Sequence, residues 1–228
     1  MKKQSAAANQ IIEEGIEVDD DSSDDDDHVK AVNVRKADYS TIDKWFDSLQ
    51  DDEDSIDTNG ILKFADELGI DAETDSVMLV LAEIMKAKQI LHFSRQEFRT
   101  GMTALGCDSP ASLKPKLAAV RNQLLDKRRF KEIYLFLYSY ALDAGQKIMS
   151  KDMAIGLWKL LFPQRFALFP KWIQFFEKNS KHGVSKDLWG QFLAFTELPG
   201  MNEGDFTAFD AIDAWPLVLD EFVSFIKG

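Results

Sequence analysis

The sequence predicts an almost wholly α-helical fold, in which two EF-hand-like helix–loop–helix pairs pack as one domain with at most very short strands. No stretch of the chain alternates strictly between apolar and polar residues, and Gly and Pro do not punctuate it at strand-like intervals. Short signals for the start of a helix recur four times. Apolar residues recur three and four positions apart, as in helices with one buried face, within Lys116 to Asp126, Phe130 to Asp143 and Lys171 to Glu177.

The N-terminal segment, residues 1–35, is predicted to be a disordered acidic tail. Residues 1–28 contain ten acidic residues and two lysines, which is a net charge of −8 out of −12 for the whole chain. A segment with so little apolar surface cannot offset the entropy lost on ordering. Ser22 and Ser23 precede a run of aspartates, which suits an acid-directed kinase, so they are candidate phosphorylation sites.

The composition of the 228 residues excludes several classes of protein. An acidic chain is not a general nucleic-acid binder, because that role needs a basic face. The single cysteine, Cys107, excludes an internal disulfide framework and a cysteine-built zinc site, so we expect no metal and no cofactor. No apolar run is long enough to span a bilayer, and no hydrophobic signal region follows the first residues. We therefore expect an intracellular protein of the nucleus and cytoplasm.

The repeated helix-start signals organise the domain, residues 36–228, into two halves of about 40–110 and 128–228. In each signal an apolar residue precedes Asp or Ser, whose side chain is suited to accept hydrogen bonds from the first amides of a helix. Ser94 with Glu97 completes a capping box. The spacings of 37, 56 and 35 residues group the signals into two pairs, namely Ile56-Asp57-Thr58 with Phe93-Ser94-Arg95, and Met149-Ser150-Lys151 with Val184-Ser185-Lys186.

Calcium ligands are largely missing from the first pair. With Phe93 at position 8 of an EF-hand loop, Glu97 falls at position 12 and suits a metal ion. Positions 1, 3 and 5 are then Lys86, Lys88 and Ile90, which do not. The alternative frame around Gly60 supplies few ligands, so the calcium sites are predicted to be degenerate.

Two apolar segments have more than one interpretation. Between Val77 and Met85 every residue except Glu83 is apolar, so this helix is either central to the core or borders an apolar groove. In the C-terminal segment, Pro216 is expected in the first turn of a helix, with Asp220 and Glu221 facing away from the core. That helix is expected to be anchored by Trp215, Leu219, Phe222 and Ile226.

Enzyme motifs are absent from the sequence. It contains no Gly-x-Ser-x-Gly elbow, no phosphate-binding glycine loop and no His-Glu-x-x-His zinc helix. Cys107 is the only thiol, and its neighbour Asp108 would raise rather than lower its pKa. We therefore interpret Cys107 as a structural residue.

Several ordered motifs resemble the defective-in-cullin-neddylation family and its potentiating-neddylation (PONY) domain. The C-terminal Ala214-Trp215-Pro216 followed by Asp220-Glu221-Phe222-Val223 is typical of that family's last helix. The resemblance runs from about residue 38 to the end of the chain. Further matches are Phe93 to Phe98, Gly101 to Ser109, Gly145-Gln146-Lys147 and Ser185 to Trp189.

The resemblance implies a non-catalytic scaffold ligase that promotes transfer of a ubiquitin-like modifier to a cullin. Family members bind the C-terminal winged-helix domain of the cullin through an acidic–small–acidic patch. Carried over to this sequence, that patch is Asp187, Ala214 and Asp220. The resemblance also implies a fold of two EF-hand-like pairs without calcium, and only an indirect role for the modifier itself.

A second site implied by the resemblance is an apolar pocket for the acetylated N-terminal methionine of the neddylation conjugating enzyme. Acetylation removes a charge that would be costly to bury. The sequence departs from family members at Ile90 and Leu91, and an insertion there affects the register of the helix before it. By alignment the pocket contains Val77, Val80, Leu81, Ile84, Leu91, Phe93, Tyr140, Leu157 and Leu160.

Two other functions remain open at this point. An EF-hand-like calcium sensor, or a general adaptor protein, would have the same helical pattern. A thioester enzyme would depend on Cys107 alone.

Overall fold

The structure is a computed structural model that describes residues 37–51, 54–180, 182–210 and 214–228. These residues belong to one compact unit, Arg35–Gly228. The predicted acidic tail, with Ser22 and Ser23, lies outside the described residues.

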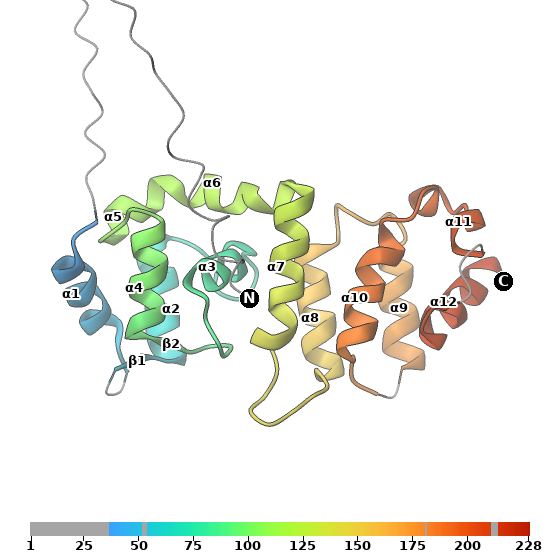
Figure 1. The fold of residues 1–228 in the computed structure, drawn as a ribbon, viewed down its shortest axis with the longest axis horizontal. Helices are drawn as coiled ribbons and strands as arrows, with labels where there is room; N and C mark the ends of the chain where they lie inside the picture. Colours follow the sequence, from blue (N-terminus) through green and yellow to red (C-terminus); the bar gives the residue numbers. More distant parts are fainter. Residues whose placement is uncertain (1–36, 52–53, 181, 211–213) are drawn as a thin grey trace, which may run out of the picture. The chain divides into compact units, whose positions relative to one another are not determined.

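Helices account for nearly all the regular structure of the described ranges, which confirms the predicted fold class (Figure 1). The first elements are α1 (Tyr39–Leu49), β1 (Ser55–Ile56), α2 (Thr58–Leu68), α3 (Val77–Met85), β2 (Phe93–Ser94), α4 (Arg95–Ala104), α5 (Pro110–Leu113), η1 (Lys114–Lys116), α6 (Leu117–Asn122) and η2 (Gln123–Leu125). They are followed by α7 (Lys127–Tyr140), α8 (Lys151–Leu161), α9 (Phe169–Asn179), α10 (Lys186–Thr196), η3 (Met201–Glu203), α11 (Thr207–Asp210) and α12 (Leu217–Lys227).

The two pairs of helix-start signals lie side by side in the structure. Ile56 pairs with Phe93 in the antiparallel sheet of β1 and β2, and Met149 pairs with Val184 in an antiparallel bridge. All four apolar residues are buried. In each pair, the apolar residues of the two repeated signals therefore contact each other through backbone pairing. The EF-hand-like description of the two halves stays a prediction.

The serines of these signals cap their helices as predicted, but Asp57 does not. Ser94, Ser150 and Ser185 accept hydrogen bonds from the amides of Glu97, Met153 and Leu188. Asp57 makes no side-chain cap, because the carboxylate of Asp51 accepts hydrogen bonds from the Asp57 and Gly60 amides instead.

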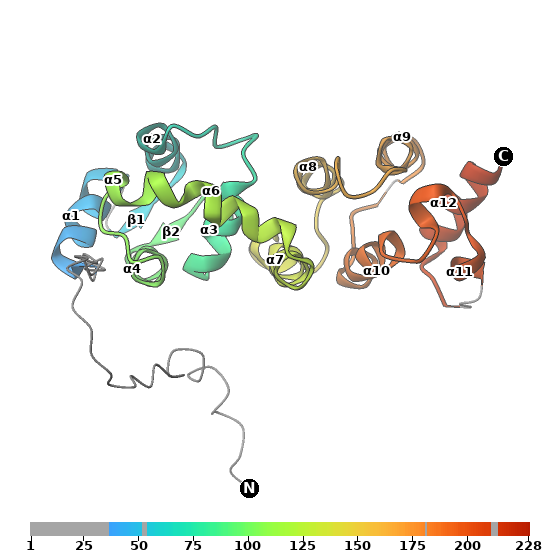
Figure 2. The ribbon, with the colours of Figure 1, turned by 90° about the horizontal axis from the view of Figure 1, so that it is seen from above.

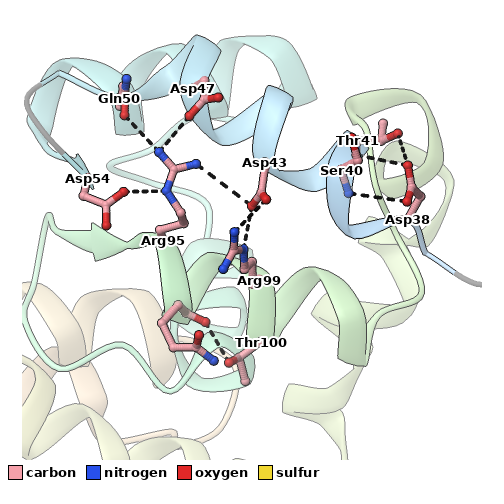
Figure 3. Close-up of polar contacts among 11 residues, drawn as sticks. Asp38, Ser40, Thr41, Asp43, Asp47, Gln50, Asp54, Arg95, Arg99 and Thr100 are labelled. Atoms are coloured by element: carbon pink, nitrogen blue, oxygen red, sulfur yellow. Dashed lines mark hydrogen bonds and ion pairs between the residues drawn. The ribbon is translucent and has the colours of Figure 1, made fainter.

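Arginine side chains of α4 attach that helix to α1 (Figure 3). Arg99 donates from Nε and Nη2 to both carboxylate oxygens of Asp43, at 2.5 and 2.6 Å. Arg95 pairs with Asp47 at 2.7 Å and with Asp54, and its guanidinium carbon lies 4.4 Å from the centroid of the Phe46 ring. These contacts cover one edge of the core between α1 and α4.

Aromatic side chains fill the core between α7, α8, α9 and α10, which Figure 2 shows grouped around a common centre. Tyr134 and Trp189 stack with ring centroids 4.3 Å apart. Trp158 stacks on Trp189 at 5.6 Å and contacts Trp172 at 5.3 Å. Such pairs add to the stability gained from apolar burial. Helix α7 also packs against α3, so it contacts both halves of the unit.

Two local expectations were wrong in detail. The segment Lys116 to Asp126 is not one continuous helix, because it divides into α6 and the 3₁₀ turn η2. Pro216 lies at the N-cap of α12 rather than inside its first turn. The helix is anchored as expected, with Leu219 and Phe222 buried and Trp215 and Ile226 packed against the core.

Candidate functional site

An apolar cavity of about 470 Å³ lies between the first and second halves of the unit. Its buried residues include Phe93 in β2, Tyr140 at the end of α7 and Leu157 in α8. A cavity of this size and lining is typical of a site for a small molecule or the end of a peptide. The remaining lining residues are Ile61, Ala72, Glu73, Met78, Leu79, Ile90, Leu91, Ser150, Asp152, Met153, Gly156 and Leu160.

The structure brings together five of the nine residues expected in the acetyl-methionine pocket, namely Leu91, Phe93, Tyr140, Leu157 and Leu160. The other four, Val77, Val80, Leu81 and Ile84, do not line this cavity.

The register of α3 explains the difference. Val77, Val80, Leu81 and Ile84 recur three and four positions apart, so they share one helical face. The first three are fully buried, and α3 packs against α4, α6 and α7. The residues of α3 that line the cavity are Met78 and Leu79. Because eight of its nine residues are apolar, periodicity did not reveal which face borders the cavity.

Leu91 forms part of the cavity wall and has an unfavourable backbone conformation. Its backbone φ is +55°, in the left-handed region that non-glycine residues avoid, and its side chain is 49% exposed. The backbone conformation costs about 1–2 kcal/mol. Residues held in such sparsely populated backbone conformations cluster at ligand sites.

Tyr140 is buried and lines the same cavity as Leu91. Burial raises the pKa of Tyr140 to about 12, so the hydroxyl is neutral at physiological pH.

The patch residues Asp187, Ala214 and Asp220 are all exposed. The two carboxylates lie in the first turns of α10 and α12, where the helix dipole favours negative charge. Helices α10 and α12 contact each other through Phe195, whose ring lies 6.2 Å from Trp215 and 6.0 Å from Phe222. Asp187 and Asp220 are therefore displayed by two helices that share the aromatic core, and Ala214 lies in the segment just before α12.

Cys107 is fully buried, and its Sγ lies 3.4 Å from the carbonyl oxygens of Leu105 and Ser112. Burial raises the pKa of its thiol. A neutral, enclosed thiol is a poor nucleophile, as expected for a structural cysteine.

Within the described ranges there is no group of three or more His, Cys, Asp or Glu side chains that is suited to hold a metal ion. Glu97, the one candidate calcium ligand of its loop, accepts hydrogen bonds from the amides of Lys88 and Ser94, at 3.1 and 2.9 Å. Among the same residues, no helix has both the length and the apolar character needed to cross a membrane.

A family model described as cullin binding matches residues 112–225. The chain is 35% identical over 185 residues to DCN1-like protein 4 of Drosophila melanogaster, covering 80% of this chain and 73% of that protein. It is 32% identical over 183 residues to human DCN1-like protein 5, with 80% and 76% covered. It is 34% identical over 195 residues to Drosophila DCN1-like protein 3, with 83% of this chain but 57% of that protein covered.

The chain belongs to the DCN1-like, or defective-in-cullin-neddylation, family. This confirms the resemblance seen in the sequence motifs. In this DCN1-like chain the segment matched as cullin binding contains all three patch residues. It also contains Tyr140, Leu157 and Leu160 of the cavity, whereas Leu91 and Phe93 precede it.

Proposed function

We propose that this DCN1-like protein is a scaffold-type ligase that binds a cullin C-terminal winged-helix domain and promotes cullin neddylation. The observation that carries the proposal is the cullin-binding family match over residues 112–225, the segment that displays Asp187, Ala214 and Asp220. Two exposed carboxylates attract a basic partner surface, and the small side chain of Ala214 lets that surface approach closely.

The second partner in this proposal is the neddylation conjugating enzyme, bound by its acetylated N-terminal methionine. The support is the apolar cavity, whose buried wall includes Phe93, Tyr140 and Leu157. An apolar wall accepts a neutral acetylated terminus far better than an ammonium group, which is costly to remove from water.

The protein acts in this proposal without a nucleophile of its own. Its only cysteine, Cys107, is buried with a raised pKa. Holding the charged conjugating enzyme and the cullin on one domain raises their effective concentration and restricts their orientation, which accelerates transfer.

Reversing the patch charges tests the cullin half of the proposal. We expect the double variant Asp187→Lys and Asp220→Lys to lose binding to a cullin C-terminal domain in calorimetry, while the circular dichroism spectrum stays unchanged and the melting temperature falls only slightly, because each lysine lies unfavourably at a helix N-terminus. Glu203→Lys, an exposed charge reversal in η3, is the matched control and should bind normally. Undiminished affinity of the double variant would contradict the assignment of the patch.

Peptide binding tests the conjugating-enzyme half. An acetylated N-terminal peptide of the conjugating enzyme should bind at least about tenfold more tightly than the same peptide with a free amine, because a charged amine loses solvation in the cavity. Equal affinities would remove this half of the mechanism.

A further inference from the structure

The cavity has a buried, uncharged apolar floor and an exposed mouth that carries negative charge. Phe93, Tyr140 and Leu157 are buried lining residues and form the floor. The charged lining residues are Glu73 and Asp152, and both are exposed. A ligand that buries its terminal residue in the floor therefore passes the two carboxylates on its way out.

Neither carboxylate has an ion-pair partner among the residues that the structure describes. This differs from other acids of the unit, such as Asp75, which pairs with Arg121 at 2.6 Å. Glu73 and Asp152 also come from different elements, the loop before α3 and the first turn of α8. Two unpaired negative charges thus flank the mouth from separate parts of the chain.

We propose that Glu73 and Asp152 select a basic side chain, Lys or Arg, in the first few residues after the acetylated residue that occupies the floor. This inference rests on the proposed function, because it assigns the sequence preference of the same cavity. An extended peptide advances about 3.4 Å per residue, so residues just outside the floor remain within reach of the mouth. Charge complementarity at such a rim selects partners and speeds association.

The two carboxylates do not make the cavity a site for a free amino terminus. The terminal group lies deepest in the proposed mode, against the aromatic and aliphatic floor, whereas Glu73 and Asp152 are in contact with solvent. The floor thus requires a neutral terminus, and the mouth favours a cation further along the peptide.

Nine model peptides, three at each of three positions, test the inference by fluorescence anisotropy. Each is an N-acetylated hexapeptide amide that begins with methionine, with alanine elsewhere except for one position that carries lysine, glutamine or glutamate. The variable position is moved from second to fourth. At the best position we expect the lysine peptide to bind about three- to tenfold more tightly than the glutamine peptide, with the glutamate peptide weakest, and the ratio to shrink as salt rises.

Charge-removing variants assign the effect to its residues. Glu73→Gln and Asp152→Asn should each reduce the lysine preference about threefold while binding the glutamine peptide as the wild type does. Glu203→Gln, which removes an exposed charge that does not line the cavity, should keep the full preference.

The possible failures are distinct. If all acetylated peptides bind but lysine gives no advantage at any position, or if a variant that combines Glu73→Gln with Asp152→Asn keeps the advantage, the inference is wrong and the proposed pocket stands. If no acetylated peptide binds, the proposed pocket fails, and the inference fails with it.

Discussion

Arg129 of α7 donates a hydrogen bond of 2.6 Å to the carboxylate of Glu83, which lies in the last turn of α3 and is only 5% exposed. Lys86 also pairs with Glu83. Glu83 is the single charged residue of the apolar helix α3. A buried carboxylate is stable only with such partners, so this pair fixes how α3 and α7 pack together.

Replacing Glu83 with Gln should lower the free energy of unfolding by about 2 kcal/mol, because it leaves Arg129 without its buried partner. Urea denaturation measures the effect. Glu132→Gln is the control, since Glu132 binds the same guanidinium at 2.6 Å from the solvent side, and it should cost much less. Equal losses for the two variants would mean that burial of Glu83 is not what matters.

The same pair predicts a dependence of stability on pH. Burial alone raises the pKa of Glu83, but hydrogen bonds from Lys86 and Arg129 outweigh it and hold the pKa below the ordinary 4.5. The pair therefore contributes fully above pH 4.5, and its contribution is lost as the pH falls below that value. From about pH 6 to about pH 3 the wild type should lose more stability than Glu83→Gln does. Parallel curves would argue against this linkage.

Leu91→Asn should separate the stability of the fold from binding in the cavity. Asn tolerates a positive φ, so the free energy of unfolding should stay the same or rise slightly. Affinity for the acetylated peptide should fall about fivefold, because half a leucine side chain contributes about 1 kcal/mol of apolar contact. A variant that unfolds more easily yet binds normally would reverse the role assigned to Leu91.

Two helical glycines should respond to alanine with opposite signs. A Cβ at Gly101 of α4 would lie 2.3 Å from Cγ of Met85 and 3.2 Å from its Cα, so Gly101→Ala should destabilise the protein by about 2 kcal/mol. A Cβ at Gly190 of α10 would meet nothing within 4 Å. Gly190→Ala should therefore stabilise it by about 0.5–1 kcal/mol. Thermal denaturation of both variants makes the comparison.

Sequence reasoning succeeded where one local rule decided the structure. The helical spacing of Phe130, Tyr134 and Leu137 predicted a buried face, and all three are buried in α7. The pairing of Ile56 with Phe93 and of Met149 with Val184 follows the spacing of the repeat.

Local sequence patterns did not predict contacts that depend on residues outside the pattern. The partner of Glu83 lies 46 positions away on another helix, and no local pattern identifies it. The cap expected at Asp57 was displaced by Asp51, six residues earlier. In α3 nearly every residue is apolar, so the sequence did not show which face of the helix borders the cavity. Met78 and Leu79 were therefore missed as cavity residues.

Tyr134 and Trp189 are joined in both directions. The Tyr134 hydroxyl donates to the Trp189 carbonyl oxygen at 2.9 Å, and Trp189 Nε1 donates to the Tyr134 carbonyl oxygen at 2.8 Å. Asp187 lies two residues before Trp189 in the same helix. The backbone that carries this carboxylate is therefore immobilised before any partner arrives. Binding of a partner at Asp187 would therefore cost little conformational entropy, because the backbone there is already ordered. A smaller entropy cost makes the complex tighter, mainly by slowing its dissociation.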